Sequence, residues 1–269
     1  MTRFKLVAAD LDDTLLTSSL EISARTVKAI EGIRAAGVHF TLATGRMYRS
    51  ALPYARQLQI TEPLITYQGA LVKDARSGEV IFYQPVPLNL AKTVLQKGYE
   101  LGVHMNVYVN DALYVDSITE KGIGYANLAG VELNPVGNLV EFLKEDPVKI
   151  LFIADPELLE QIQPDLEKQH SGELYITRSK PNYLEFMHPR ANKGEALAAV
   201  AAAMGVSRED VVAFGDSFND LTMIHFAGLG VAMGNAWPEV KMQADCVTAG
   251  HDDDGVARVL EKLEFYGGN

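Results

Sequence analysis

The stretch FKLVAADLDDTL, residues 4–15, decides the fold. Its apolar half, Phe4 to Ala9, is too short for a helix and has the length and composition of a buried strand. The strand is expected to end at Asp10, where the acidic residues begin. In an open α/β sheet, ligands lie beyond the carboxyl ends of the strands, so we look for the chemistry of this chain at such positions.

The segments that follow alternate between helix and strand. Ser23 can cap a helix in which Val27, Ile30 and Ile33 recur at helical spacing, and Gly37 is placed to end it. The next expected elements are a strand at 38–43, a helix around 50–58, and a strand at 64–67 closed by Gln68-Gly69. This β-α-β-α-β order favours a parallel sheet.

The pattern changes in the middle of the chain and then returns. The expected middle elements are a hairpin of 70–74 and 79–83, a helix near 90–101, a hairpin turning at 110–111, a strand at 148–154, a helix after 156, and strands near 174–177 and 183–187. After 192 we expect a helix to 204, a strand at 211–214, a helix from about 219, a strand at 229–232 and a last helix after 255. We therefore predict an α/β fold, in which a doubly wound, Rossmann-like core domain (1–84 and 189–269) is interrupted by an inserted α+β domain (85–188).

Composition narrows the class of protein. The 269 residues are 48% hydrophobic and 22% charged, which is typical of an ordinary globular chain. The formal net charge of −11 argues against a nucleic-acid partner, because such binding depends on Lys and Arg. We expect no membrane partner and a cytoplasmic location, since neither a membrane-spanning run nor a signal-peptide core is visible. The single cysteine, Cys246, is expected to be a small buried side chain, and the oligomeric state stays open.

Polar residues follow several of the predicted strands. Asp10-Leu11-Asp12 follows the first strand, Thr44-Gly45-Arg46 the second, and Asp216 to Asp220 the strand after the insert, while Lys193 opens a helix. Each motif alone has another explanation, because aspartate often makes turns and lysine often begins a solvated helix. Their joint appearance at strand ends predicts one site. Carboxylates with a hydroxyl and a lysine suit Mg²⁺ and phosphate, since Mg²⁺ takes oxygen ligands and shares them with phosphate.

Asp10 and Asp12 lie two residues apart and can have different roles. A carboxylate attacks phosphorus when Mg²⁺ and cationic donors reduce the charge repulsion, and an aspartyl phosphate results. The second carboxyl group can transfer a proton, which requires a pKa raised by its neighbours.

The chain resembles the haloacid dehalogenase superfamily and, within it, the Cof-type sugar-phosphatase-like hydrolases with a large α/β cap. The resemblance covers essentially the whole chain, since DLDDTL (10–15), LATGR (42–46), NKG (192–194) and GDSFNDLTM (215–223) match its four motifs. It implies a phosphatase acting on small phosphorylated metabolites, with Mg²⁺ as cofactor. The implied catalytic residues are Asp10, Asp12, Thr44 and Lys193; the implied phosphate-binding residues are Leu11, Gly45, Arg46, Asn192 and Asn219; and the implied metal residues are Asp10, Asp12 through its backbone carbonyl, Asp216 and Asp220.

Two departures from the family pattern are visible, and two other functions stay open. Asp13 stands where glycine is commoner, which adds charge without changing a ligand. Gln68 replaces the usual asparagine, and this departure makes relatives a poor guide to the substrate. A phosphomutase or phosphotransferase would return the phosphoryl group to a second hydroxyl instead of water. A signalling receiver domain would accept phosphate on an aspartate without turnover. In such a domain, however, the acidic cluster precedes the phosphorylated aspartate by one whole βα unit.

Overall fold

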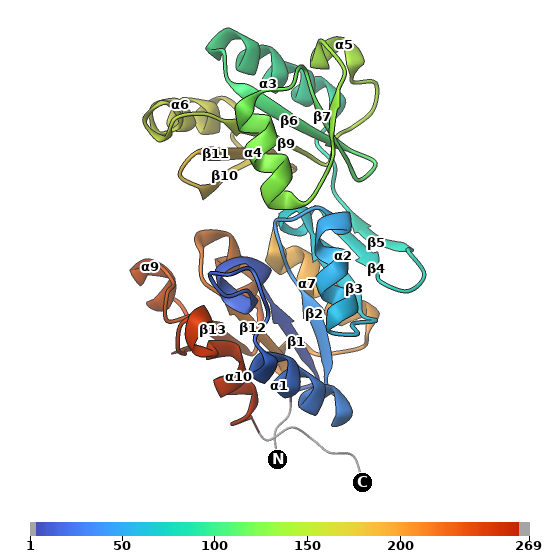
Figure 1. The fold of residues 1–269 in the computed structure, drawn as a ribbon, viewed down its shortest axis with the longest axis vertical. Coiled ribbons are helices and arrows are strands. Elements are labelled where there is room, and N and C mark those ends of the chain that lie inside the picture. Colours follow the sequence, from blue (N-terminus) through green and yellow to red (C-terminus); the bar gives the residue numbers. More distant parts are fainter. Residues whose placement is uncertain (1–3, 264–269) are drawn as a thin grey trace. The chain divides into compact units, whose positions relative to one another are not determined.

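The computed structural model describes residues 4–263, which form two compact units (Figure 1). The described part of the first unit comprises residues 4–45, 51–82 and 192–263, and the second comprises 46–50 and 83–191. The predicted assignment of 85–188 to an accessory domain stays a prediction. None of the helices between residues 4 and 263 is long and apolar enough to cross a membrane.

A parallel sheet of five strands forms the centre of the first unit. Its order is β14-β13-β12-β1-β2. The strands are β1 (Leu6–Ala9), β2 (His39–Leu42), β12 (Val211–Gly215), β13 (Leu229–Ala232) and β14 (Cys246–Val247). Leu6 pairs with Val211 on one side and with His39 on the other, so β1 lies inside the sheet. All four residues of β1 are buried, as expected for a strand covered on both faces.

Helices cover the sheet of the first unit. They are α1 (Ala24–Ala35), α2 (Tyr48–Gln57), whose first residues belong to the second unit, α7 (Lys193–Ala203), α8 (Leu221–Phe226), α9 (Pro238–Lys241) and α10 (Gly255–Leu260). Alternate residues of β1, Leu6 and Ala8, pack with Leu197 and Val200 of α7 in one apolar core. Together with the topology, this confirms the predicted α/β class.

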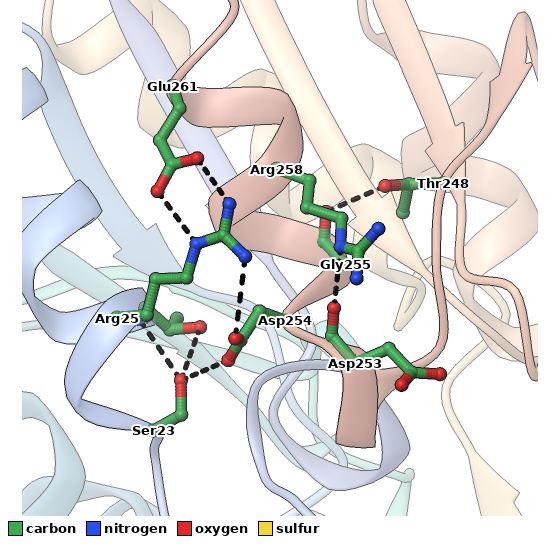
Figure 2. Close-up of polar contacts among 9 residues, drawn as sticks. Ser23, Arg25, Thr248, Asp253, Asp254, Gly255, Arg258 and Glu261 are labelled. Atoms are coloured by element: carbon green, nitrogen blue, oxygen red, sulfur yellow. Dashed lines mark hydrogen bonds and ion pairs between the residues drawn. The ribbon is translucent and has the colours of Figure 1, made fainter.

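Figure 2 shows how the last helix is joined to the first. Ser23 caps α1 by accepting a hydrogen bond from the Thr26 N–H, and its hydroxyl donates to Asp254 Oδ1 at 2.5 Å. Arg25 donates two hydrogen bonds to Glu261, at 2.7 and 2.9 Å. These contacts hold α10 against the start of α1, just after the loop that follows β1.

The third predicted strand has the expected parallel contact with the second strand, and it also has an antiparallel partner that was not predicted. β3 (Pro63–Thr66) forms an antiparallel ladder with β4 (Leu71–Asp74), which is followed by β5 (Val80–Tyr83), while an isolated parallel bridge joins Ile65 to Ala43 at the end of β2. The reason is local, because residues 67–69 all have positive φ and turn the chain back at once. An antiparallel neighbour needs only such a turn, whereas a parallel one needs a crossover. The predicted hairpin of 70–74 and 79–83 is confirmed as β4 and β5.

The second unit has one sheet of six strands in the order β10-β11-β9-β6-β7-β8. Its strands are β6 (His104–Val109), β7 (Ala112–Val115), β8 (Leu133–Pro135), β9 (Lys149–Ile153), β10 (Tyr175–Lys180) and β11 (Tyr183–Met187). Its helices are α3 (Leu88–Leu101), α4 (Glu120–Ala129), α5 (Leu139–Phe142) and α6 (Pro156–Gln169). Side chains of α3, α5 and α6 pack on one face in an apolar core with Phe152 and Phe186, while the other face carries the buried ion pair Lys149–Glu185 at 3.2 Å.

The prediction for Cys246 is wrong, because this residue is exposed. It begins β14, a strand of two residues at the edge of the sheet, where only one side is paired. The β14 strand, together with α4, α5, β8 and α9, was not predicted from the sequence.

Candidate active site

The first functional side chains meet at the carboxyl end of β1. Asp10 directly follows this strand, and its N–H donates to the Phe214 carbonyl of β12. Lys193 is the first residue of α7, and its Nζ donates to Asp10 Oδ1 at 2.6 Å and to Asp220 Oδ1 at 2.5 Å. The Lys193 side chain is fully buried, so its charge is balanced by these two carboxylates rather than by water.

Asp220 anchors the loop that follows β12. Its Oδ2 accepts hydrogen bonds from the backbone N–H groups of Asp216 and Ser217, at 2.9 and 3.0 Å. A Cβ atom at position 215 would collide with Asp220, so only glycine leaves room for this carboxylate. Both oxygens of Asp220 thus have partners inside the protein, and these contacts hold the loop and Lys193 in place.

Three carboxylates of this region fit a divalent cation. Asp10, Asp216 and Asp220 each offer an oxygen, and these oxygens lie within 4.8 Å of one another. The donor set contains only hard oxygen atoms, which is the chemistry that Mg²⁺ requires. Thr14 Oγ1 donates to Asp216 Oδ1 at 3.0 Å and fixes the orientation of that carboxylate.

The protonation of this cluster follows from its burial. Burial raises the pKa of Asp10 to about 8, against the lowering effect of Lys193, and the charges of Asp220 and Asp12 add to the rise. Burial also raises the pKa of Asp216 to about 9, together with the charges of Asp220 and Asp10. Burial alone would lower the pKa of Lys193, but Asp10 and Asp220 raise it, so the ammonium group stays charged. Without a metal ion, Asp10 and Asp216 thus keep their protons near neutral pH, because ionising all three carboxyl groups would place more negative charge in the cluster than one lysine offsets.

Thr44 and Gly45 lie on the neighbouring loop. Thr44 is fully buried, its N–H donates to the Ile65 carbonyl, and its own carbonyl accepts from the Gln68 N–H at 3.0 Å. A Cβ atom at position 45 would collide with the side-chain amide of Gln68. The Oε1 atom of that amide accepts a hydrogen bond from Asn219 Nδ2 at 2.8 Å.

The remaining predicted residues have distinct places. The Asn192 side chain caps α7 through the Glu195 N–H, which places Lys193 in the first turn. Leu11 is fully buried, and its role stays a prediction. The Asp12 side chain is half-buried and lies outside the group of three clustered carboxylates. Arg46 belongs to the second unit, and its role stays a prediction.

Two residues of the site had no predicted role. Thr14 lies in the first motif, four positions after Asp10, and the structure shows its contact with Asp216. Gln68 attracted notice only as a departure from a family pattern, although a polar residue directly after a buried strand is a usable signal.

The arrangement can bind and attack a phosphoryl group. A carboxylate oxygen of Asp10 is held against an ammonium group, beside carboxylates that suit a cation. Positive charge of this kind offsets the repulsion between a carboxylate and a phosphate and stabilises the charge that spreads in the transition state.

A family model described as haloacid dehalogenase-like hydrolase matches residues 7–260, and the chain belongs to this family. Within the family it is a phosphatase. It is 37% identical over 262 residues to a protein of Haemophilus influenzae, covering 96% of this chain and 98% of the relative. The 5-amino-6-(5-phospho-D-ribitylamino)uracil phosphatase of Bacillus subtilis is 35% identical, covering 97% and 98%. A crystal structure from Thermotoga maritima, 35% identical, superimposes with a TM-score of 0.86 over 97% of this chain and 98% of that one.

Proposed function

We propose that this chain is a Mg²⁺-dependent phosphatase that hydrolyses small phosphorylated metabolites through an aspartyl phosphate on Asp10. The observation that carries the proposal is the contact of 2.6 Å between Lys193 Nζ and Asp10 Oδ1 at the end of β1. A lysine in this place keeps a buried carboxylate available as a nucleophile and offers a positive charge to the phosphate.

The proposed reaction has two steps at phosphorus. An oxygen of Asp10 attacks the phosphorus atom, the ester P–O bond breaks, and the leaving alkoxide takes a proton from the carboxyl group of Asp12. A water molecule then attacks the same phosphorus atom, gives its proton to Asp12, and releases orthophosphate and the carboxylate of Asp10. Asp12 thus acts as acid in the first step and as base in the second.

Other residues hold the phosphoryl group and the cation. Asp10, Asp216 and the backbone carbonyl of Asp12 would hold Mg²⁺, with Asp220 supporting them through its contacts with Lys193 and the Asp216 N–H. When bound, the cation neutralises phosphate charge and stabilises the charge of the transition state. The residues proposed to position the phosphoryl group are Thr44, Lys193, Asn192 and Asn219, together with the backbone of Leu11, Gly45 and Arg46.

The proposed substrate class rests on the relatives. The Bacillus subtilis relative is named for a phosphorylated ribitylaminouracil, which is a small metabolite. We propose that this chain takes a phosphomonoester of similar size, selected by an accessory domain of residues 85–188. A cytoplasmic location also stays a prediction.

A phosphate-release screen tests the proposal. Purified protein is incubated with sugar phosphates, nucleoside monophosphates and pyridoxal phosphate, with and without Mg²⁺, beside Asp10→Asn. We expect release of orthophosphate from at least one compound, dependent on Mg²⁺ and absent in D10N. Release without any acceptor alcohol distinguishes hydrolysis from phosphoryl transfer. Equal release by D10N and wild type would overturn the proposal.

A further inference from the structure

Gln68 lies where two loops of the candidate site meet, and its backbone is held in an unusual conformation. The φ angles of Tyr67, Gln68 and Gly69 are +52°, +58° and +95°, so three successive residues are left-handed. Two of them carry side chains, for which this region is costly, and such conformations persist only where the surroundings impose them. Here the Gln68 N–H donates to the Thr44 carbonyl at 3.0 Å, and Gly69 packs so closely on the Asn192 carbonyl that a Cβ would collide.

The side chain of Gln68 is turned inward by this backbone. It is only 3% exposed, and its amide packs directly against the Cα of Gly45. Its Oε1 accepts a hydrogen bond of 2.8 Å from Asn219 Nδ2. One buried amide therefore joins the loop of Thr44 and Gly45 to the loop that carries Asp216 and Asp220.

We infer that Gln68 is a positioning residue that fixes the side-chain amide of Asn219 for the phosphoryl group, an inference that rests on the proposed function. Burying a polar amide is unfavourable unless the amide is hydrogen-bonded. The hydrogen bond from Asn219 offsets this cost for the buried Gln68 side chain and holds it in place. With one Nδ2 proton given to Gln68, the plane of the Asn219 amide is set. Its second N–H and its Oδ1 then meet each substrate in one orientation, which lowers the entropy lost on binding.

A double-mutant cycle tests this inference. We expect Gln68→Met, which keeps the volume and removes the acceptor, to lower kcat/KM by about tenfold, the scale seen when a supporting hydrogen bond to a site residue is lost. Asn219→Ala is expected to cost at least as much. If Gln68 acts through Asn219, the double variant loses no more than N219A alone. Losses that multiply in the double variant, or a Q68M enzyme with wild-type kcat/KM, would overturn the inference.

Two further variants separate positioning from folding. Gln68→Asn keeps an amide, and asparagine tolerates the left-handed region well, but its side chain is one methylene shorter than the one that contacts Asn219. It is expected to fold and to lose as much kcat/KM as Q68M; full activity of Q68N would contradict the inference. Gln59→Ala is the matched control, because Gln59 also has a left-handed backbone (φ +55°) but is exposed. We expect wild-type kinetics for Q59A.

The same cycle can be measured without turnover. Calorimetry of orthophosphate binding in the presence of Mg²⁺ should show the same non-additivity between Q68M and N219A. Failure of the proposed function would appear as a wild-type protein without Asp10-dependent phosphate release. Failure of the present inference would leave that release intact and appear as wild-type kinetics of Q68M or Q68N, or as additive losses in the cycle.

Discussion

Lys193 Nζ lies 2.6 Å from Asp10 Oδ1, although the two residues are 183 positions apart in the chain. The same ammonium group holds Asp220, whose other oxygen binds the loop of Asp216. One buried charge therefore connects the ends of β1 and β12 with the start of α7. The site depends on this charge for its electrostatics and for its geometry.

Replacing Lys193 by methionine tests this dependence. Lys193→Met keeps most of the volume but leaves Asp10 and Asp220 without the buried ammonium group that pairs with both. Since loss of one donor to the transition state costs about 10²–10³ in kcat, we expect a fall of at least about a hundredfold. Steady-state kinetics at saturating Mg²⁺ measure the effect, and K193R serves as a charge-conserving control. Near-normal turnover of K193M would show that catalysis does not depend on the charge of Lys193.

Thr14 offers a milder test of the predicted metal site. Thr14→Val removes the hydrogen bond of 3.0 Å to Asp216 while keeping the shape of the side chain. Loss of a supporting hydrogen bond to a metal ligand typically weakens affinity 10–100-fold, and we expect about tenfold here. Calorimetric titration with Mg²⁺ measures the change, and T14S should restore the affinity. The idea fails if T14V binds Mg²⁺ as tightly as T14S.

The raised pKa values predict how pH acts on the metal-free protein. Asp10 and Asp216 have folded pKa values of about 8 and about 9, above the usual 3.8, so the folded state binds more protons than the unfolded state between these limits. Their contribution to stability is complete below pH 3.8 and is lost as the pH rises through 8 to 9. We expect the Tm of metal-free protein to fall from pH 6 to pH 9, and a D10N/D216N variant to flatten this fall.

Mg²⁺ competes with the same protons. Binding requires deprotonated carboxylates, so the apparent Kd should fall about tenfold per pH unit for each proton released, until the pH passes 9. The increase in Tm caused by Mg²⁺ should therefore be larger at pH 8.5 than at pH 6.5. A shift independent of pH would show that the cation does not bind at Asp10 and Asp216.

Asp12 is expected to act by proton transfer, and leaving groups of different basicity reveal this. Asp12→Asn should slow hydrolysis of an alkyl phosphate by 10²–10⁴-fold, because the alkoxide needs a proton. p-Nitrophenolate is a good leaving group that needs no proton, so the substitution should slow the first step with p-nitrophenyl phosphate much less. Rapid-quench measurement of the first turnover compares the two esters. Equal slowing with both would count against Asp12 as the acid.

Much of the site could be predicted because topology places it. Parallel strands bring their carboxyl ends to one edge, so Asp10, Thr44 and Asp216 were expected together before any contact was known. The partners of each atom could not be predicted in this way. That Asp220 uses both oxygens inside the protein, and that Gln68 reaches Asn219, depends on loop conformations that the spacing of residues leaves open.

The missed elements have local physical reasons. Helix α4 contains Gly122 and Gly124, which lower helix propensity, and tertiary packing overrides this because Gly122 lies close against the ring of His104. Strand β14 has only two residues, too few for any periodic pattern. The antiparallel turn at 67–69 was hidden because tyrosine and glutamine rarely adopt positive φ.

The junction of α1 and α10 allows a test of stability apart from the chemistry (Figure 2). Ser23→Ala removes the cap of α1 and the hydrogen bond to Asp254, and a lost cap typically costs about 1 kcal/mol. Arg25→Ala breaks an ion pair whose two side chains are 45% and 42% exposed, and water screens such a pair. Urea unfolding should therefore show a clear loss of stability for S23A and a smaller one for R25A. Because neither residue contacts Asp10 or Lys193, both variants should keep wild-type kcat/KM at low temperature, and the reverse order of stability would show that the ion pair, not the cap, holds α10.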